Sequence, residues 1–128
     1  MLKQPLVLIV DDEEYIREII KIKLEANGIE VKEAGNGSEG LILAVRYIPN
    51  VILLDLIMPI MGGVETLAKL QANEKTKDIK VFLFTGKGDP RPDITEMSKK
   101  FAIDSGAVDF IRKETDLNDI LKEIQKYI

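Results

Sequence analysis

The sequence predicts a doubly wound α/β fold, in which helices cover both faces of a five-stranded parallel sheet. Three observations support this prediction. Five short apolar runs recur at fairly even spacing, and stretches with helical periodicity separate them. With 128 residues and 45% hydrophobic content, the chain is long enough for one compact core and too short for two. We therefore expect a (βα)5 arrangement in a single domain over residues 1–128.

Four of the five runs are almost continuously apolar or β-branched, as in parallel strands that are buried on both faces. The second run alternates apolar and polar residues, which indicates a less covered position in the sheet. The predicted strands are Leu6–Val10, Ile29–Ala34, Val51–Leu54, Val81–Phe84 and Val108–Ile111.

The stretches between these strands repeat apolar residues at helical spacing. In chain order, the predicted buried faces are Ile16, Ile19, Ile20 and Leu24; Leu41, Ala44, Val45 and Ile48; Val64, Leu67 and Ala68; Ile94, Met97 and Phe101; and Leu117, Ile120, Leu121 and Ile124. Residues typical of helix ends bound them: Gly28, Ser38, Pro49, Asp93 with Glu96, and Gly106.

Composition excludes several kinds of chemistry. The chain has no His and no Cys, so a cysteine protease, a Ser-His-Asp hydrolase, a His-ligated zinc site and a thiol redox site are excluded. The chain also cannot carry a phosphohistidine of its own. Any chemistry must use Asp, Glu, Lys, Ser, Thr or Tyr, with a metal ion that prefers oxygen ligands.

The net charge of −4, from 18 basic and 22 acidic residues, argues against a surface that binds nucleic acid directly. No segment resembles a signal peptide or a membrane span, so we expect a cytoplasmic protein. The chain ends where the fifth predicted helix ends, and we expect no attached output domain.

Polar residues follow the predicted strands at one edge of the sheet, where ligands bind in folds of this class. At this edge, the first strand is followed by Asp11, Asp12 and Glu13, the third by Asp55 and the fourth by Thr85, while the fifth supplies Phe110 and Lys113. Taken singly, each residue has a structural explanation, such as a helix cap or a solvated surface group. Together, the carboxylates require a cation, for which Mg²⁺ is the natural choice, and the lysine suits a phosphoryl group. These residues are therefore predicted to form a site at which a phosphoryl group is attached to a carboxylate.

At these residues the sequence resembles the receiver domain of two-component response regulators, over essentially the whole chain. The resemblance rests on IVDDE at 9–13, LLDLIMPIMGG at 53–63, FTG at 84–86 and GAVDFIRK at 106–113. It implies a flavodoxin-like fold and a phospho-acceptor switch that catalyses only its own aspartyl phosphorylation and dephosphorylation.

By this resemblance, Asp55 is the phosphate acceptor. Asp12, Asp55 and the carbonyl of Ile57 ligate Mg²⁺, while Asp11 acts mostly through a metal-bound water. The resemblance also gives Lys113 the role of pairing with the phosphoryl group.

The same resemblance makes Thr85 a hydrogen-bond donor to the phosphoryl group. It makes Phe110 the switch aromatic, which turns inward as Thr85 moves toward the phosphate. The implied partners are a sensor histidine kinase or histidine phosphotransfer protein and a downstream protein target. The implied state is a monomer or a phosphorylation-dependent dimer.

Two features depart from the family pattern. Glu114 follows Lys113, where members usually have a proline joined by a cis peptide, and the segment 86–93 is longer than usual. A cis bond before a residue other than proline costs about 3 kcal/mol, so we predict a trans Lys113–Glu114 bond.

Two other functions remain open at this point. The first is an interaction module that keeps the fold without phosphorylation. The second is a hydrolase with an aspartyl-phosphate intermediate, although Ile57 stands where such enzymes generally need a second Asp.

Overall fold

The computed structural model describes residues 4–86, 100 and 102–128. Their strands are β1 (Leu6–Val10), β2 (Glu30–Ala34), β3 (Val51–Asp55), β4 (Lys80–Thr85) and β5 (Asp109–Arg112). Their helices are α1 (Glu14–Glu25), α2 (Gly37–Tyr47), α3 (Gly63–Ala72) and α5 (Leu117–Gln125). The predicted helical face of Ile94, Met97 and Phe101, with Asp93 and Glu96, lies outside the described residues.

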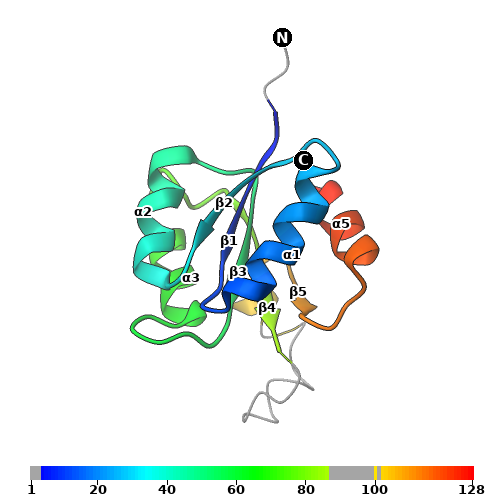
Figure 1. The fold of residues 1–128 in the computed structure, drawn as a ribbon. Coiled ribbons are helices and arrows are strands. Elements are labelled where there is room, and N and C mark those ends of the chain that lie inside the picture. Colours follow the sequence, from blue (N-terminus) through cyan, green and yellow to red (C-terminus); the bar gives the residue numbers. More distant parts are fainter. Residues whose placement is uncertain (1–3, 87–99, 101) are drawn as a thin grey trace.

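The five strands form one parallel sheet in the order β2-β1-β3-β4-β5. Helices α2 and α3 lie on one face of this sheet, and α1 and α5 lie on the other (Figure 1). The prediction of a doubly wound (βα)5 fold is therefore confirmed. As predicted, β2 is the less covered strand, because it lies at an edge and buries only Val31 and Ala34.

Successive residues of the central strands contribute to opposite faces of the sheet. Leu8 and Val10 belong to the core beneath α2 and α3, whereas Val7 and Ile9 belong to the core beneath α1 and α5. Because both faces are covered, β1 and β3 are buried along their whole length. This explains why these two strands appear in the sequence as continuous apolar runs.

Helix α1 has the predicted buried face, with Ile20 and Leu24 fully buried. It ends before Gly28, whose φ of +78° is a left-handed conformation that glycine adopts without strain.

The start of α2 differs from the prediction. Ser38 was expected to cap this helix, but it lies inside the helix, and Asn36 is the capping residue. The Asn36 side chain accepts a hydrogen bond of 2.9 Å from the backbone N–H of Glu39. At the other end, Ile48 was expected on the buried face, but it has left-handed backbone and is exposed. The helix is therefore shifted toward the amino terminus relative to its predicted face.

The predicted buried face of α3 is wrong for two of its three residues. Leu67 is buried as expected, but Val64 and Ala68 are exposed. The helix instead buries Thr66, Leu67 and Leu70, together with Gly63 in its first turn. Thr66 can be buried because its hydroxyl donates a 2.8 Å hydrogen bond to the carbonyl oxygen of Gly62.

In the part of the chain that the structure describes, no helix is both long and apolar enough to cross a bilayer.

Candidate functional site

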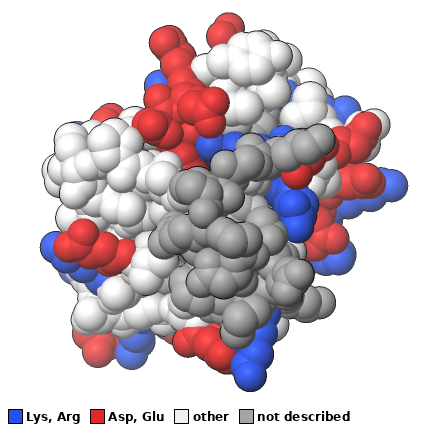
Figure 2. All heavy atoms as spheres, turned by 90° about the horizontal axis from the view of Figure 1, so that it is seen from below, with Lys and Arg blue, Asp and Glu red and all other residues white. Residues whose placement is uncertain are grey.

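The parallel register brings the ends of β1, β3, β4 and β5 to one edge of the sheet. Val10 pairs with Leu54, so Asp11 and Asp55 lie beside each other at the ends of adjacent strands. Asp55 in turn pairs with Phe84, and Thr85 pairs with Arg112, which precedes Lys113. Seen from this edge, acidic side chains gather in a patch next to basic ones (Figure 2). The predicted convergence of these residues is thus present.

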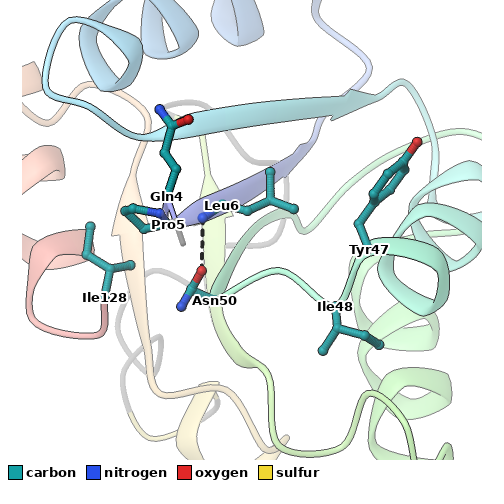
Figure 3. Close-up of a pocket in the computed structure, with 7 residues that line it drawn as sticks. All are labelled: Gln4, Pro5, Leu6, Tyr47, Ile48, Asn50 and Ile128. Carbon is teal, nitrogen blue, oxygen red and sulfur yellow. Dashed lines mark hydrogen bonds between the residues drawn. The ribbon is translucent and has the colours of Figure 1, made fainter. Parts of the chain in front are cut away.

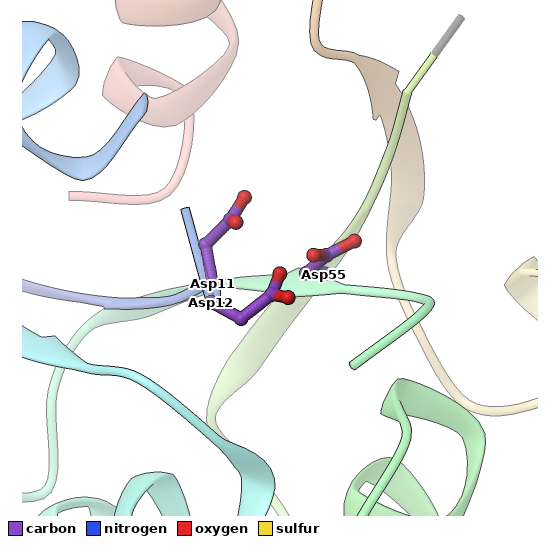
Figure 4. A group of neighbouring side chains, drawn as sticks. All are labelled: Asp11, Asp12 and Asp55. Atoms are coloured by element: carbon purple, nitrogen blue, oxygen red, sulfur yellow. The ribbon is translucent and has the colours of Figure 1, made fainter. Parts of the chain in front are cut away.

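Asp11, Asp12 and Asp55 form a cluster of carboxylates at this edge (Figure 4). One oxygen from each residue lies within 4.8 Å of the others. Asp11 and Asp55 are buried, whereas Asp12 is exposed. Two buried carboxylates at this separation repel each other unless cations lie close to both.

Lys113 supplies one such cation. Its Nζ lies 2.8 Å from Asp11 Oδ2, 2.8 Å from Glu13 Oε1 and 3.2 Å from Asp55 Oδ2. The Lys113 side chain is only 10% exposed, so its contacts with Asp11 and Asp55 are largely shielded from water, whereas the Glu13 side chain is 59% exposed. One ammonium group therefore forms ion pairs with three carboxylates.

The carboxyl of Asp55 is held far from its usual titration range. Burial, followed by the neighbouring charge of Asp11, raises the pKa of Asp55 to about 7, although Lys113 and the Ile57 N–H act in the opposite direction. Burial alone would lower the pKa of Lys113, but its contacts with Asp11, Glu13 and Asp55 raise that pKa above its ordinary value. The cluster therefore favours additional positive charge.

The cluster also has the donor chemistry for a hard divalent cation. Mg²⁺ prefers carboxylate and carbonyl oxygens, and these three side chains offer carboxylates only. Asp11 Oδ2 is buried, and among the described residues its only polar partner is the Lys113 ammonium at 2.8 Å. A carboxylate oxygen has two lone pairs, so one ammonium contact leaves a lone pair for a metal ion. The residues present fit Mg²⁺.

The loop after β3 is held by close backbone packing at Gly63. The N–H of Gly63 donates a 3.0 Å hydrogen bond to the carbonyl of Leu56. A Cβ at position 63 would overlap the carbonyl oxygen of Asp55 and would lie 2.9 Å from Cα of Leu56. Glycine is therefore required here, because the start of α3 packs directly against the backbone that carries Asp55.

Ile57, Thr85 and Phe110 lie around this cluster. The Ile57 N–H donates to Asp55 Oδ1 at 3.3 Å, and its side chain is 43% exposed. Thr85 ends β4 as a buried residue, and its carbonyl accepts a 2.7 Å hydrogen bond from the Lys113 N–H. Phe110 is half-buried against the core beneath α2 and α3. The roles predicted for these residues remain predictions, and so does metal ligation by the Ile57 carbonyl.

Three further residues contact the cluster; Glu13 was predicted to follow the first strand at this edge without a specific role, and Phe84 and Arg17 were not predicted at the site. Glu13 pairs with Lys113, and the ring centroid of Phe84 lies 5.8 Å from the same ammonium. The Arg17 Nη1 donates a 2.6 Å hydrogen bond to the carbonyl of Asp11, and its Nε lies 3.2 Å from Glu33 Oε1. No sequence spacing indicates these contacts, because their partners lie on other elements.

The bond between Lys113 and Glu114 is trans, since the described residues contain no cis peptide bond. This confirms the prediction made from the missing proline. Glu114 Oε1 lies 3.7 Å from Arg112 Nη1. With this trans bond, Lys113 Nζ lies 3.2 Å from Asp55 Oδ2. The part of the predicted long segment 86–93 beyond Gly86 lies outside the described residues.

A pocket of about 330 Å³ lies elsewhere, near the amino ends of β1 and β3 (Figure 3). Its lining residues are Gln4, Pro5, Leu6, Tyr47, Ile48, Asn50 and Ile128. None of these side chains is charged, and the Asn50 Oδ1 is occupied by a 2.9 Å hydrogen bond from the Leu6 N–H. The carboxylate cluster is the stronger candidate for a site of chemistry.

Comparison with protein families gives a match to the response regulator receiver domain over residues 7–125. Among curated relatives, the DNA-binding dual master transcriptional regulator RpaA of Synechocystis is 34% identical over 121 residues, which is 94% of this chain and 48% of that protein. The transcriptional regulatory protein SrrA of Staphylococcus aureus is 34% identical over 93% of this chain and 46% of its own length. The chain spans about half the length of these relatives.

Solved structures give the same result. A CheY-like receiver domain protein from Methanospirillum hungatei is 31% identical, with a TM-score of 0.83 over 97% of this chain and 93% of that one. The chemotaxis response regulator CheY4 of Vibrio cholerae is 27% identical, with a TM-score of 0.84 over 98% of this chain and all of the other. Sequence and fold thus agree on one group of proteins.

Proposed function

The chain belongs to the response regulator receiver domain family, and from this membership we propose that Asp55 accepts a phosphoryl group from a phosphohistidine of a partner protein. Receiver domains act in two-component signal transduction as phospho-acceptor switches, and they are not enzymes with a separate substrate. The observation that carries the assignment to Asp55 is its position at the end of a central strand, 3.2 Å from the ammonium of Lys113.

In the proposed reaction, an oxygen of the Asp55 carboxylate attacks the phosphorus atom in line with the leaving nitrogen. The new O–P bond forms as the P–N bond breaks, and the electron pair of that bond leaves with the imidazole of the partner. Lys113 pairs with the transferring phosphoryl oxygens, and Thr85 donates a hydrogen bond to them. Positioning and charge neutralisation are most of what phosphoryl transfer requires of a protein.

Asp11, Asp12 and Asp55, with the carbonyl of Ile57, are the residues that would hold Mg²⁺. When bound, this ion neutralises the charge that the carboxylates and the phosphoryl oxygens bring together. The buried Asp11 Oδ2, whose contact with Lys113 leaves one lone pair unused, supports this assignment.

Phosphorylation adds up to two negative charges at this edge of the sheet. We infer that Thr85 moves toward the phosphoryl group and that Phe110 turns further inward, which alters a face that binds a partner. The half-buried position of Phe110 is compatible with such a change, because the ring is neither fully packed nor fully exposed.

The proposed partners are a sensor histidine kinase or histidine phosphotransfer protein, which supplies the phosphoryl group, and a downstream protein. We propose that residues 1–128 act as one receiver domain whose own surface contacts protein and not DNA. The net charge of −4 supports this, because phosphate backbones are bound by basic surfaces.

The experiment that tests the proposed function is incubation of the purified chain with acetyl phosphate and Mg²⁺. Intact-mass spectrometry should show the addition of one phosphoryl group, and chelation of Mg²⁺ by EDTA should suppress it. Absence of the added mass under both conditions would mean that the chain is a receiver-like interaction module without phosphorylation.

We expect Asp12→Ala to weaken Mg²⁺ binding at least about tenfold, because the variant removes one ligand from the metal cluster. The side chain is exposed, so the fold should be retained. Isothermal titration calorimetry measures the affinity. Glu14→Ala removes the same charge from the first turn of α1, outside the cluster, and serves as the control. Equal affinities of the two variants would contradict the metal assignment.

A further inference from the structure

Glu13 makes a contact that neither its position in α1 nor the proposed reaction explains. It occupies the N-cap position of α1, where a side-chain oxygen commonly accepts a hydrogen bond from the first turn of the helix. The Glu13 side chain makes no such bond. Its Oε1 lies instead 2.8 Å from Lys113 Nζ, which is 100 residues away in the sequence.

The surroundings of Glu13 separate it from the metal cluster. Its side chain is 59% exposed, whereas the other two partners of Lys113, Asp11 and Asp55, are almost fully buried. Glu13 is also not part of the group of carboxylates that could share one metal ion. A cation bound by that group would neutralise Asp11 and Asp55 and would leave Glu13 as the remaining anionic partner of Lys113.

The backbone ties Glu13 to the same place. Its N–H donates a 2.8 Å hydrogen bond to Asp11 Oδ1, so the start of α1 is fixed beside the buried carboxylate. Rotation of the side chain can therefore break the contact with Lys113 without moving the helix. Lys113 in turn hydrogen bonds through its N–H to the carbonyl of Thr85, so only the end of its side chain is free to change partner.

We propose that Glu13 is a positioning residue that holds the Lys113 ammonium in the unphosphorylated state and competes for it with the phosphoryl group on Asp55. The proposal rests on the proposed function of Asp55. Phosphorylation breaks the ion pair between Lys113 and Glu13 and replaces it with an ion pair between Lys113 and the phosphoryl oxygens. Glu13 then becomes an unpaired carboxylate at the start of α1, which couples the phosphorylation state to the surface of that helix.

Beryllofluoride, which imitates a phosphoryl group on a carboxylate, measures this competition directly. With Mg²⁺ at saturation, Glu13→Gln should bind beryllofluoride about two- to fivefold more tightly than the wild type, because one exposed ion pair no longer has to be broken. Glu13→Asp, which shortens the side chain by one methylene, should give an intermediate affinity. Glu14→Gln removes the same charge from the next residue and should leave the affinity close to that of the wild type.

A double-mutant cycle separates the ion pair from general repulsion by the Glu13 charge. If Glu13 acts through Lys113, then Glu13→Gln should have no effect in a Lys113→Ala background. If the Glu13 charge acts only by repelling beryllofluoride, Glu13→Gln would also increase the affinity in the Lys113→Ala background. That result would overturn the proposal. An equal gain from Glu14→Gln, or no gain from Glu13→Gln, would also overturn it.

A second measurement needs neither metal nor phosphate. In protein free of Mg²⁺, the side-chain 1H–15N NMR signal of the Lys113 ammonium should shift in Glu13→Gln and stay in place in Glu14→Gln. An unchanged signal in Glu13→Gln contradicts the ion pair itself. If the wild-type protein shows the ion pair but binds no beryllofluoride, the proposed function of Asp55 is refuted. The proposed competition between Glu13 and the phosphoryl group is then refuted as well.

Discussion

Asp55→Asn is expected to lose phosphoryl uptake from acetyl phosphate completely. An amide lacks the anionic oxygen that attacks phosphorus, and no other carboxylate of the cluster ends a central strand. Intact-mass spectrometry in the presence of Mg²⁺ measures the loss. Asp78→Asn is the matched control, because Asp78 is exposed and lies two residues before the amino-terminal end of β4, away from the cluster.

The same substitution should raise the stability of the protein in the absence of metal. Asp55 is buried beside Asp11, and the raised pKa of Asp55 means that the fold disfavours its charged form. Removing that charge relieves the repulsion, and thermal unfolding in EDTA should show a higher Tm for Asp55→Asn than for Asp78→Asn. Phosphorylation that persists undiminished in Asp55→Asn would show that the acceptor is a different residue.

Gly63→Ala should reduce the free energy of unfolding by about 2–4 kcal/mol. The new methyl group would overlap the carbonyl of Asp55 and the backbone of Leu56, and neither can move without disturbing the end of β3. Urea denaturation measures the loss. Because the same backbone carries the acceptor, the rate of phosphorylation should fall in the fraction that remains folded.

The neighbouring glycine provides the control for this prediction. At Gly62 a Cβ would lie 3.5 Å from the carbonyl oxygen of Leu56, which is an ordinary contact, and the backbone φ of −73° suits any residue. Gly62→Ala should therefore cost less than about 1 kcal/mol. Equal stabilities of the two variants would show that α3 does not press against the strand that carries Asp55.

The sheet could be predicted from the sequence because each central strand is buried on both faces. Burial of this kind requires a continuous apolar run, and Leu6–Val10 and Val51–Leu54 have that pattern within the buried strands β1 and β3. The edge strand β2 is covered less, and its alternating sequence indicated as much.

Helix ends and helix faces were predicted less well. Asn36 and Ser38 are both good capping residues, and the choice between them depends on which one has extended backbone where the chain leaves β2. In α3, the apolar residues Val64 and Ala68 face outward because close packing of Gly63 against β3 sets the rotation of the helix. A short helix with a small apolar face does not determine its own rotation.

The sequence alone determined which residues follow the strands at the candidate site, and only the tertiary structure decided how they pair and that Arg17 and Phe84 also contact the cluster. Residues that follow parallel strands must meet at one edge of the sheet, so Asp11, Asp55, Thr85 and Lys113 were predictable from strand positions. The pairing of Lys113 with Glu13, and of Arg17 with the carbonyl of Asp11, depends on loop paths and on where each helix packs. These contacts join residues on different elements, and no local pattern in the sequence specifies distances between elements.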